Sequence, residues 1–209
     1  MSQEFKTPNK QANAGKTALV LIQGSGPCRP GVWARSVCVN DSFEIGSMMP
    51  QIEWANQLGF PLLVMNANLI KDPVSGKEVP VCNSRKNHAS YVWKHFVEPS
   101  GFKDIKLIVH SDGGLLLEHI QLEFKDTFYK QVTKIALTDV ARIIKANQLN
   151  NEQKQFMKKN CLHYVASNKA LGDEVRRVGE ICPGVSAGTT DHKYTTGISW
   201  PLIQDQFFS

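Results

Sequence analysis

The sequence of 209 residues is 42% hydrophobic, a length and composition typical of one globular domain with a single core. Its net charge of +5 arises from 24 basic and 19 acidic residues that form no long basic run, so direct nucleic-acid binding is not expected. No apolar run approaches the ~20 residues that a membrane-spanning helix needs, and the polar first fifteen residues lack the apolar block of a signal peptide. We expect an intracellular protein, nuclear or cytoplasmic, without membrane association.

Five apolar, β-branched runs separated by helical patterns dominate the chain. Near-continuous apolar strands are buried on both faces, which is typical of parallel sheets. The runs cover residues 17–22 (TALVLI), 61–65 (PLLVM), 105–109 (IKLIV), 132–137 (VTKIAL) and 162–166 (LHYVA).

Three helical patterns lie between these runs. One is capped by Ser47 with Pro50 in its first turn, places Ile52, Ala55 and Leu58 on the buried face, and stops at Gly59. A second spans residues 88–97, and a third starts at Gly113 and buries Leu116, Ile120 and Phe124. This alternation predicts an α/β fold with a doubly wound, mostly parallel sheet. We expect a polar tail over residues 1–15 and a single domain over residues 16–209.

The five cysteines show no metal-binding or redox pattern. None of them forms the close C-x-x-C pair of a zinc site or a thiol–disulfide motif. We therefore expect reduced thiols, no metal and no cofactor. The cysteines are Cys28, Cys38, Cys82, Cys161 and Cys182.

A serine stands where the third apolar run gives way to a helix. A nucleophile elbow places its serine in a strained strand-to-helix turn, and the positions two residues away must be small. Gly113 meets this need downstream of Ser111, but Val109 does not meet it upstream. The turn would aim the Ser111 hydroxyl at the helix N-terminus, where free N–H groups favour a developing oxyanion. A simple helix cap is the other interpretation of Ser111.

The glycine-rich segment after the first strand predicts the other half of an oxyanion hole. In a hydrolase of this type, one N–H comes from this loop, near Gly24 and Ser25, and one from the residue after the nucleophile, Asp112. Glycine allows the backbone to approach a substrate closely. The same pattern also serves an ordinary tight turn.

A histidine and an aspartate follow in the chain order Ser, Asp, His of an α/β-hydrolase. His192 lies on a loop near the C-terminus and is the predicted base. Asp139 ends the fourth strand and is the predicted acid, with Asp173 after the fifth strand as the alternative. The other histidines lie on predicted helices or strands, where structural roles suffice: His88, His95, His110, His119 and His163.

Taken together, these motifs resemble the Argonaute-binding protein 2 (Arb-type) domain family. That family is regarded as α/β-hydrolase-like and includes a fission-yeast Argonaute complex subunit and a metazoan cotranscriptional regulator. The resemblance implies a minimal α/β-hydrolase-like fold, the family serine at Ser111, and protein partners in Argonaute or cotranscriptional machinery. Only 20 residues lie between Asp139 and Asn160, too few for a separate lid domain. The motifs are Leu21–Gly26, Trp33–Arg35, His88–Phe96, His110–Gly114, Ala136–Asp139 and Val185–Gly188.

Three departures from the family pattern surround the predicted chemistry. Gln23 replaces a histidine, Asp112 replaces an aromatic residue, and Val109 crowds the elbow. The Asp112 carboxylate would oppose negative charge on a nearby oxyanion. We therefore expect a protein-interaction or assembly module with a degenerate catalytic site. Two alternatives stay open: a serine hydrolase of esterase or thioesterase type that uses Ser111, His192 and Asp139, and a structural subunit of a large protein assembly.

Overall fold

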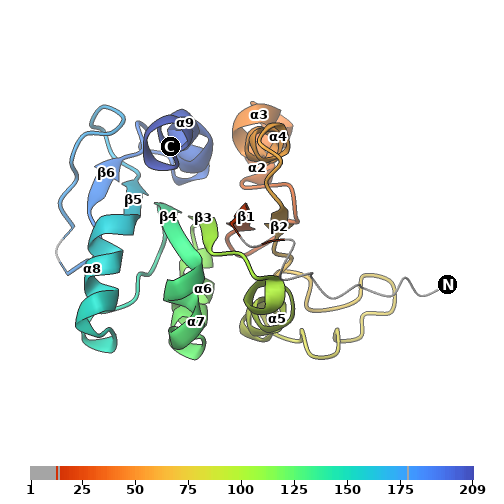
Figure 1. Ribbon diagram of the computed structural model, residues 1–209. Helices are drawn as coiled ribbons and strands as arrows, with labels where there is room; N and C mark the ends of the chain where they lie inside the picture. The colour runs from red at the N-terminus through yellow and green to blue at the C-terminus, as the bar shows by residue number, and fades with distance from the viewer. Residues whose placement is uncertain (1–12, 14, 178) are drawn as a thin grey trace.

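The structure is a computed structural model that describes residues 13, 15–177 and 179–209 (Figure 1). Most of the predicted polar tail, residues 1–12 and 14, lies outside the described residues. Within the described part, the Asn13 side-chain amide donates a 2.9 Å hydrogen bond to the Ser100 carbonyl oxygen. No helix formed by the described residues is both long and apolar enough to cross a bilayer.

In the described part of the chain, six strands form one sheet in the order β2-β1-β3-β4-β5-β6, and every pairing between neighbours is parallel. Five of these strands occupy the apolar runs of the sequence. The sixth, β6, was not predicted because its three residues, GVS, are too short and too polar to give a signal. The bounds are β1 Thr17–Ile22, β2 Leu62–Val64, β3 Asp104–His110, β4 Val132–Thr138, β5 Cys161–Val165 and β6 Gly184–Ser186.

Helices cover both faces of the sheet, as Figure 1 shows. The doubly wound α/β fold predicted from the sequence is therefore present. On one face lie α5 (Arg85–Val92), α6 (Gly113–Glu123), α7 (Lys125–Gln131) and α8 (Asn151–Asn160). On the other face lie α2 (Arg35–Asn40), α3 (Phe43–Gly46), α4 (Met49–Gln57) and α9 (Thr195–Leu202). Short 3-10 or π segments are Trp93–Val97, Glu98–Ser100, Ala146–Gln148, His192–Tyr194 and Ile203–Phe207.

The alternation of side chains along β1 divides the core into two clusters. Val20 and Ile22 pack toward α5 and α6, whereas Leu19 and Leu21 pack toward α4 and α9. All four side chains are at most 3% exposed. The continuous apolar run in the sequence therefore reflects burial on both faces of the strand.

The helix that Ser47 is predicted to cap begins one residue later than that cap implies. The Ser47 hydroxyl accepts a 3.2 Å hydrogen bond from the Met49 N–H, and α4 runs from Met49 to Gln57. Ala55 is buried as predicted, but the prediction that Leu58 shares the buried face was wrong, since Leu58 is 52% exposed. The helix ends before Leu58, and Gly59 turns the chain at a φ of +68°.

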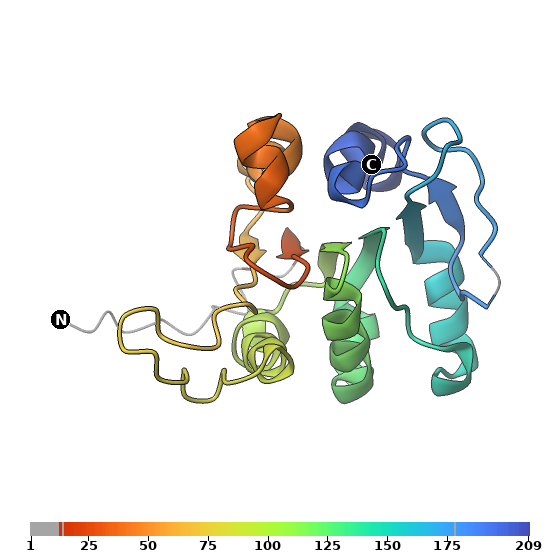
Figure 2. The same ribbon diagram turned by 180° about the vertical axis from the view of Figure 1, so that it is seen from behind.

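The long connection between β2 and α5 extends beside α5 and beyond the sheet, as the view from behind shows (Figure 2). It ends at Ser84, whose hydroxyl caps α5 by accepting a 3.1 Å hydrogen bond from the Asn87 N–H. The first residue of α5 is Arg85. This cap therefore fixes where the Arg85 side chain leaves the helix.

Candidate active site

The connections that follow β1 and β3 run toward opposite edges of the sheet. β1 and β3 are direct neighbours, yet the next strand after β1 is β2 on one side, and the next after β3 is β4 on the other. In open α/β sheets, such a point opens a crevice at the carboxyl ends of the strands. The loop that begins at Gln23 and the turn at Ser111 both lie at this crevice.

The turn after β3 holds Ser111 in a left-handed backbone conformation, with a φ of +56°. A non-glycine residue adopts this conformation only when its surroundings hold it there. A Cβ on Gly113 would lie 2.9 Å from the Ile22 carbonyl oxygen and 3.2 Å from Val109 Cγ1. Because Gly113 has no Cβ, the fully buried Val109 fits beneath the turn. The expected steric conflict at Val109 does not prevent the elbow.

The structure brings Ser111, His192 and Asp139 together. His192 Nε2 lies 2.8 Å from Ser111 Oγ, and His192 Nδ1 lies 2.6 Å from Asp139 Oδ2. Asp139 follows β4, the strand next to β3, and His192 begins the 3-10 turn that leads into α9. Three segments far apart in the sequence therefore meet at the crevice.

Asp139 is held as an oriented carboxylate. Burial raises the pKa of Asp139, but the hydrogen bonds from His192 and from the Ala166 N–H (3.1 Å) more than offset this, so the pKa lies below its ordinary value. The side chain is 18% exposed, against 45% for His192. An ionised carboxylate on Nδ1 fixes the tautomer of His192 that leaves Nε2 free to accept the Ser111 proton.

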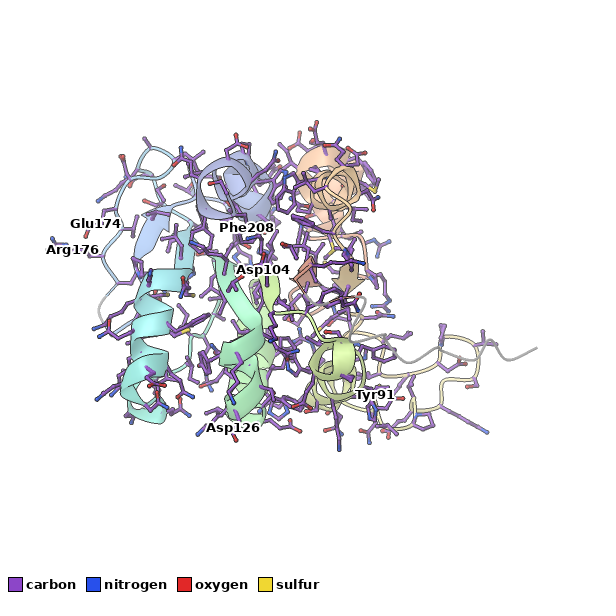
Figure 3. All side chains as sticks on the ribbon, in the orientation of Figure 1. Tyr91, Asp104, Asp126, Glu174, Arg176 and Phe208 are labelled. Carbon is purple, nitrogen blue, oxygen red and sulfur yellow. The ribbon has the colours of Figure 1, made fainter. Side chains whose placement is uncertain are left out.

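Asp173, the alternative acid, lies at a different place. It precedes β6 and lines a separate surface hollow with Lys169 and Glu174. Figure 3 labels Glu174 at the outer margin of the molecule beside β6. Among the described residues, no hydrogen bond or ion pair joins Asp173 to His192, and the two line different hollows.

The loop after β1 passes directly against the serine. A Cβ on Gly24 would lie 2.9 Å from Ser111 Cβ, so only glycine allows this approach. The Asn68 side-chain amide holds the loop by donating 2.9 Å hydrogen bonds to the carbonyl oxygens of Gly24 and Cys28. Gly24 and Ser25 line the same cavity as Ser111, which is where the sequence places one side of an oxyanion hole.

The Asp112 carboxylate is paired with Arg85, the first residue of α5. Asp112 is not among the described residues that line the cavity at Ser111. The guanidinium therefore balances the negative charge that the sequence places next to the oxyanion hole. The Gln23 side chain is 1% exposed, does not line that cavity, and has no hydrogen-bond partner in the described part of the chain.

His110 belongs to the site, although the sequence indicated only a structural role for it. Its ring stacks on His192 with centroids 4.8 Å apart and an interplanar angle of 26°. His110 Nδ1 lies 3.0 Å from the Thr138 carbonyl oxygen, which can only accept, so Nδ1 carries the proton. Burial, with a smaller contribution from the charge of His192, lowers the pKa of His110 to about 4. The position of His110 directly before Ser111 was the one feature of the sequence that could have indicated a place in the site.

A cavity of about 480 Å³ opens beside Ser111 and His192. Its volume lies in the range of small-molecule sites. Trp33, Pro27 and Val39 supply apolar wall, and Arg35 and Lys193 supply positive charge. Among the described residues, no three His, Cys, Asp or Glu side chains lie together as metal ligands. The arrangement can deprotonate a serine and direct it at a carbonyl carbon.

Comparisons with known proteins agree with the motifs. The family model described as the Arb2 domain matches residues 5–171. A chicken protein named "Cotranscriptional regulator ARB2A homolog" is 27% identical over 241 aligned positions, which cover 91% of this chain and 58% of that protein. A Caenorhabditis elegans FAM172 family protein homologue is 37% identical over 139 positions, 66% of this chain and 41% of that protein. The chain therefore spans well under two thirds of the length of these relatives.

Among solved structures, the histone deacetylase Clr3 contains a similar fold. The similarity has a TM-score of 0.60 at 15% identity and covers 92% of this chain and 31% of that one. At this low identity, the similarity shows a shared fold alone and carries no information about activity.

Proposed function

The chain belongs to the Arb2 domain family, and we propose that it acts as a regulatory protein-interaction module. The observation that carries this proposal is the cotranscriptional-regulator name of relatives that align with about nine tenths of the chain. We further propose a nuclear site of action within a protein complex, without direct contact to nucleic acid.

Two exposed apolar side chains, one of which lines the cavity, offer a contact for this role. Val39 in α2 is 72% exposed and Phe43 in α3 is 62% exposed. Exposed large apolar side chains are a common feature of protein-binding surfaces.

Affinity purification of the full chain with quantitative mass spectrometry tests the module. We expect transcription-associated proteins to be enriched with the wild type and lost with the double variant Val39→Glu, Phe43→Glu. Val74→Glu is the matched control, because Val74 is 95% exposed in the connection between β2 and α5. Equal recovery with all three proteins, or tight binding of purified chain to RNA or DNA, would contradict the proposal.

A second function, hydrolysis of an acyl ester or thioester, is favoured by one specific observation. The hydroxyl, imidazole and carboxylate of Ser111, His192 and Asp139 form a continuous hydrogen-bonded chain. Of the three departures from the family pattern, Val109 is accommodated by Gly113, and the Asp112 charge is balanced by Arg85. The geometry therefore supports a reactive serine.

In this reaction, Ser111 Oγ attacks the acyl carbon while His192 Nε2 takes its proton. His192 then protonates the leaving oxygen or sulfur, and water releases the acid from the acyl-serine by the reverse proton path. Asp139 holds the imidazole and stabilises its positive form. N–H groups near Ser25 and at Asp112 would bind the oxyanion. Because His192 is 45% exposed, the site exchanges with bulk water.

A fluorophosphonate probe tests the reactivity of Ser111 directly. We expect labelling of the wild type, none of Ser111→Ala, and labelling slower on the order of ten-thousandfold for Asp139→Asn. Asp173→Asn serves as the matched control and should label like the wild type. A folded wild type that resists the probe at high concentration would refute the hydrolase and leave the interaction module standing.

A further inference from the structure

The cavity beside Ser111 carries positive charge without a carboxylate. Arg35 and Lys193 line it together with His192, and no Asp or Glu is among the described residues of its lining. Charges that face a concave, partly apolar wall act more strongly than on an open surface, since less water screens them. A bound molecule would therefore meet a positive field here.

Arg35 is the cation available to a ligand. Among the described residues, Arg35 has no ion-pair partner, whereas Lys193 Nζ lies 3.4 Å from Asp191 Oδ2. The nearby Asp41 carboxylate accepts a 2.7 Å hydrogen bond from the Tyr194 hydroxyl, and Asp41 lies outside the cavity lining. A guanidinium offers a planar fork of donors that suits a carboxylate or a phosphate.

The same cavity offers an apolar wall next to this cation. Trp33 and Ala34 precede Arg35 directly in the chain, and Val39 follows one helical turn later. The Trp33 indole is fixed by a 3.1 Å hydrogen bond from its N–H to Gln51 Oε1. The cavity therefore combines a nucleophile, a rigid apolar wall and an unpaired guanidinium.

We propose, on the basis of the proposed Ser111 site, that this cavity selects esters that carry a negatively charged group, with Arg35 binding the anion. Ser111 Oγ forms the new bond to the acyl carbon as the bond to the leaving oxygen breaks, and the Ser111 proton passes through His192 to that oxygen. Water then releases the acid. The anionic group is unchanged, and it belongs either to the acyl part or to the leaving group.

Steady-state hydrolysis of four esters by the full chain tests this selectivity. The acyl arm compares p-nitrophenyl hemisuccinate with neutral p-nitrophenyl butyrate, and the leaving-group arm compares 4-acetoxyphenyl phosphate with phenyl acetate. We expect kcat/KM to be about fivefold or more higher for the anionic ester than for the neutral ester in one arm. A preference of this size is what a partly exposed charge pair contributes. Raising the ionic strength should reduce the preference, because salt screens exposed charges.

Three charge variants test whether Arg35 causes the preference for anionic esters. Arg35→Gln should abolish it, Arg35→Lys should keep part of it, and Lys154→Gln should leave it unchanged, because Lys154 lies on α8 away from the cavity. Equal kcat/KM for anionic and neutral esters in both arms, or a preference that survives Arg35→Gln, would overturn the proposal.

Binding to Ser111→Ala separates this proposal from the proposed hydrolysis. Calorimetry would compare N-phenylsuccinamic acid with butyranilide, which are stable amide counterparts of the acyl arm, and phenyl phosphate with phenol for the leaving-group arm. If an anionic ligand binds more tightly than its neutral counterpart, and Arg35→Gln removes this difference, the preference for anionic ligands is supported even if no ester is turned over. If the chain turns over esters but binds anionic and neutral ligands equally well, the proposed hydrolysis at Ser111 stands and the proposed preference for anionic ligands is refuted.

Discussion

Replacing His110 with asparagine should remove a specific part of the acid sensitivity of the fold. His110 is 3% exposed, stacks on His192, and lies within hydrogen-bond reach of Thr138 and Thr196. Its pKa falls from 6.5 to about 4 on folding, mainly through burial. The folded state therefore binds its proton less readily than the unfolded state does.

The sign and size of the effect follow from linkage. A group whose pKa is lowered on folding contributes its full stability above the unfolded pKa, and this contribution is lost as the pH falls from 6.5 toward 4. Between pH 7 and pH 4.5, the shift removes about 2 to 3 kcal/mol from the free energy of unfolding. His110→Asn lacks this contribution because asparagine does not titrate.

Urea unfolding at pH 7 and pH 4.5 measures the difference. We expect the wild type to lose about 2 to 3 kcal/mol more between these pH values than His110→Asn does. His95→Asn, at an exposed histidine, should lose as much as the wild type. Equal losses for the wild type and His110→Asn would refute the reasoning that His110 is buried as a neutral ring.

Two further substitutions test the support of the turn. Gly114→Ala should lower the free energy of unfolding by about 3 kcal/mol in thermal or urea unfolding, because a Cβ there would clash with the Arg142 carbonyl oxygen; an unchanged midpoint would contradict the packing. Arg85→Gln should slow fluorophosphonate labelling about tenfold by leaving the Asp112 carboxylate unpaired near Ser111. Adding Asp112→Asn should restore the rate, and a double variant as slow as the single one would exclude charge as the cause.

The strands were predictable because burial on two faces leaves a continuous apolar run, as in residues 17–22 and 105–109. The left-handed turn at Ser111 was predictable from Gly113 and from the position of the serine between strand and helix. Strand β6 was not predictable, because its three residues are extended through pairing with β5 and their own composition gives no strand signal.

Contacts between distant segments set the limit of the sequence analysis. Asp139 and Asp173 both follow strands, and only the strand order shows that β4 lies next to the strand that carries Ser111. The pairing of Arg85 with Asp112 and the stacking of His110 on His192 depend on how α5 and α9 pack on the sheet. No local pattern encodes either contact.

The hydrogen bond between His192 and Asp139 can be observed directly by proton NMR of the folded chain. A proton shared between an imidazole Nδ1 and a carboxylate at 2.6 Å should give a resolved resonance far downfield of the amide region. We predict this resonance in the wild type and in Asp173→Asn, and its loss in Asp139→Asn. Its absence from the wild type, or its persistence in Asp139→Asn, would contradict the arrangement from which the proposed chemistry at Ser111 follows.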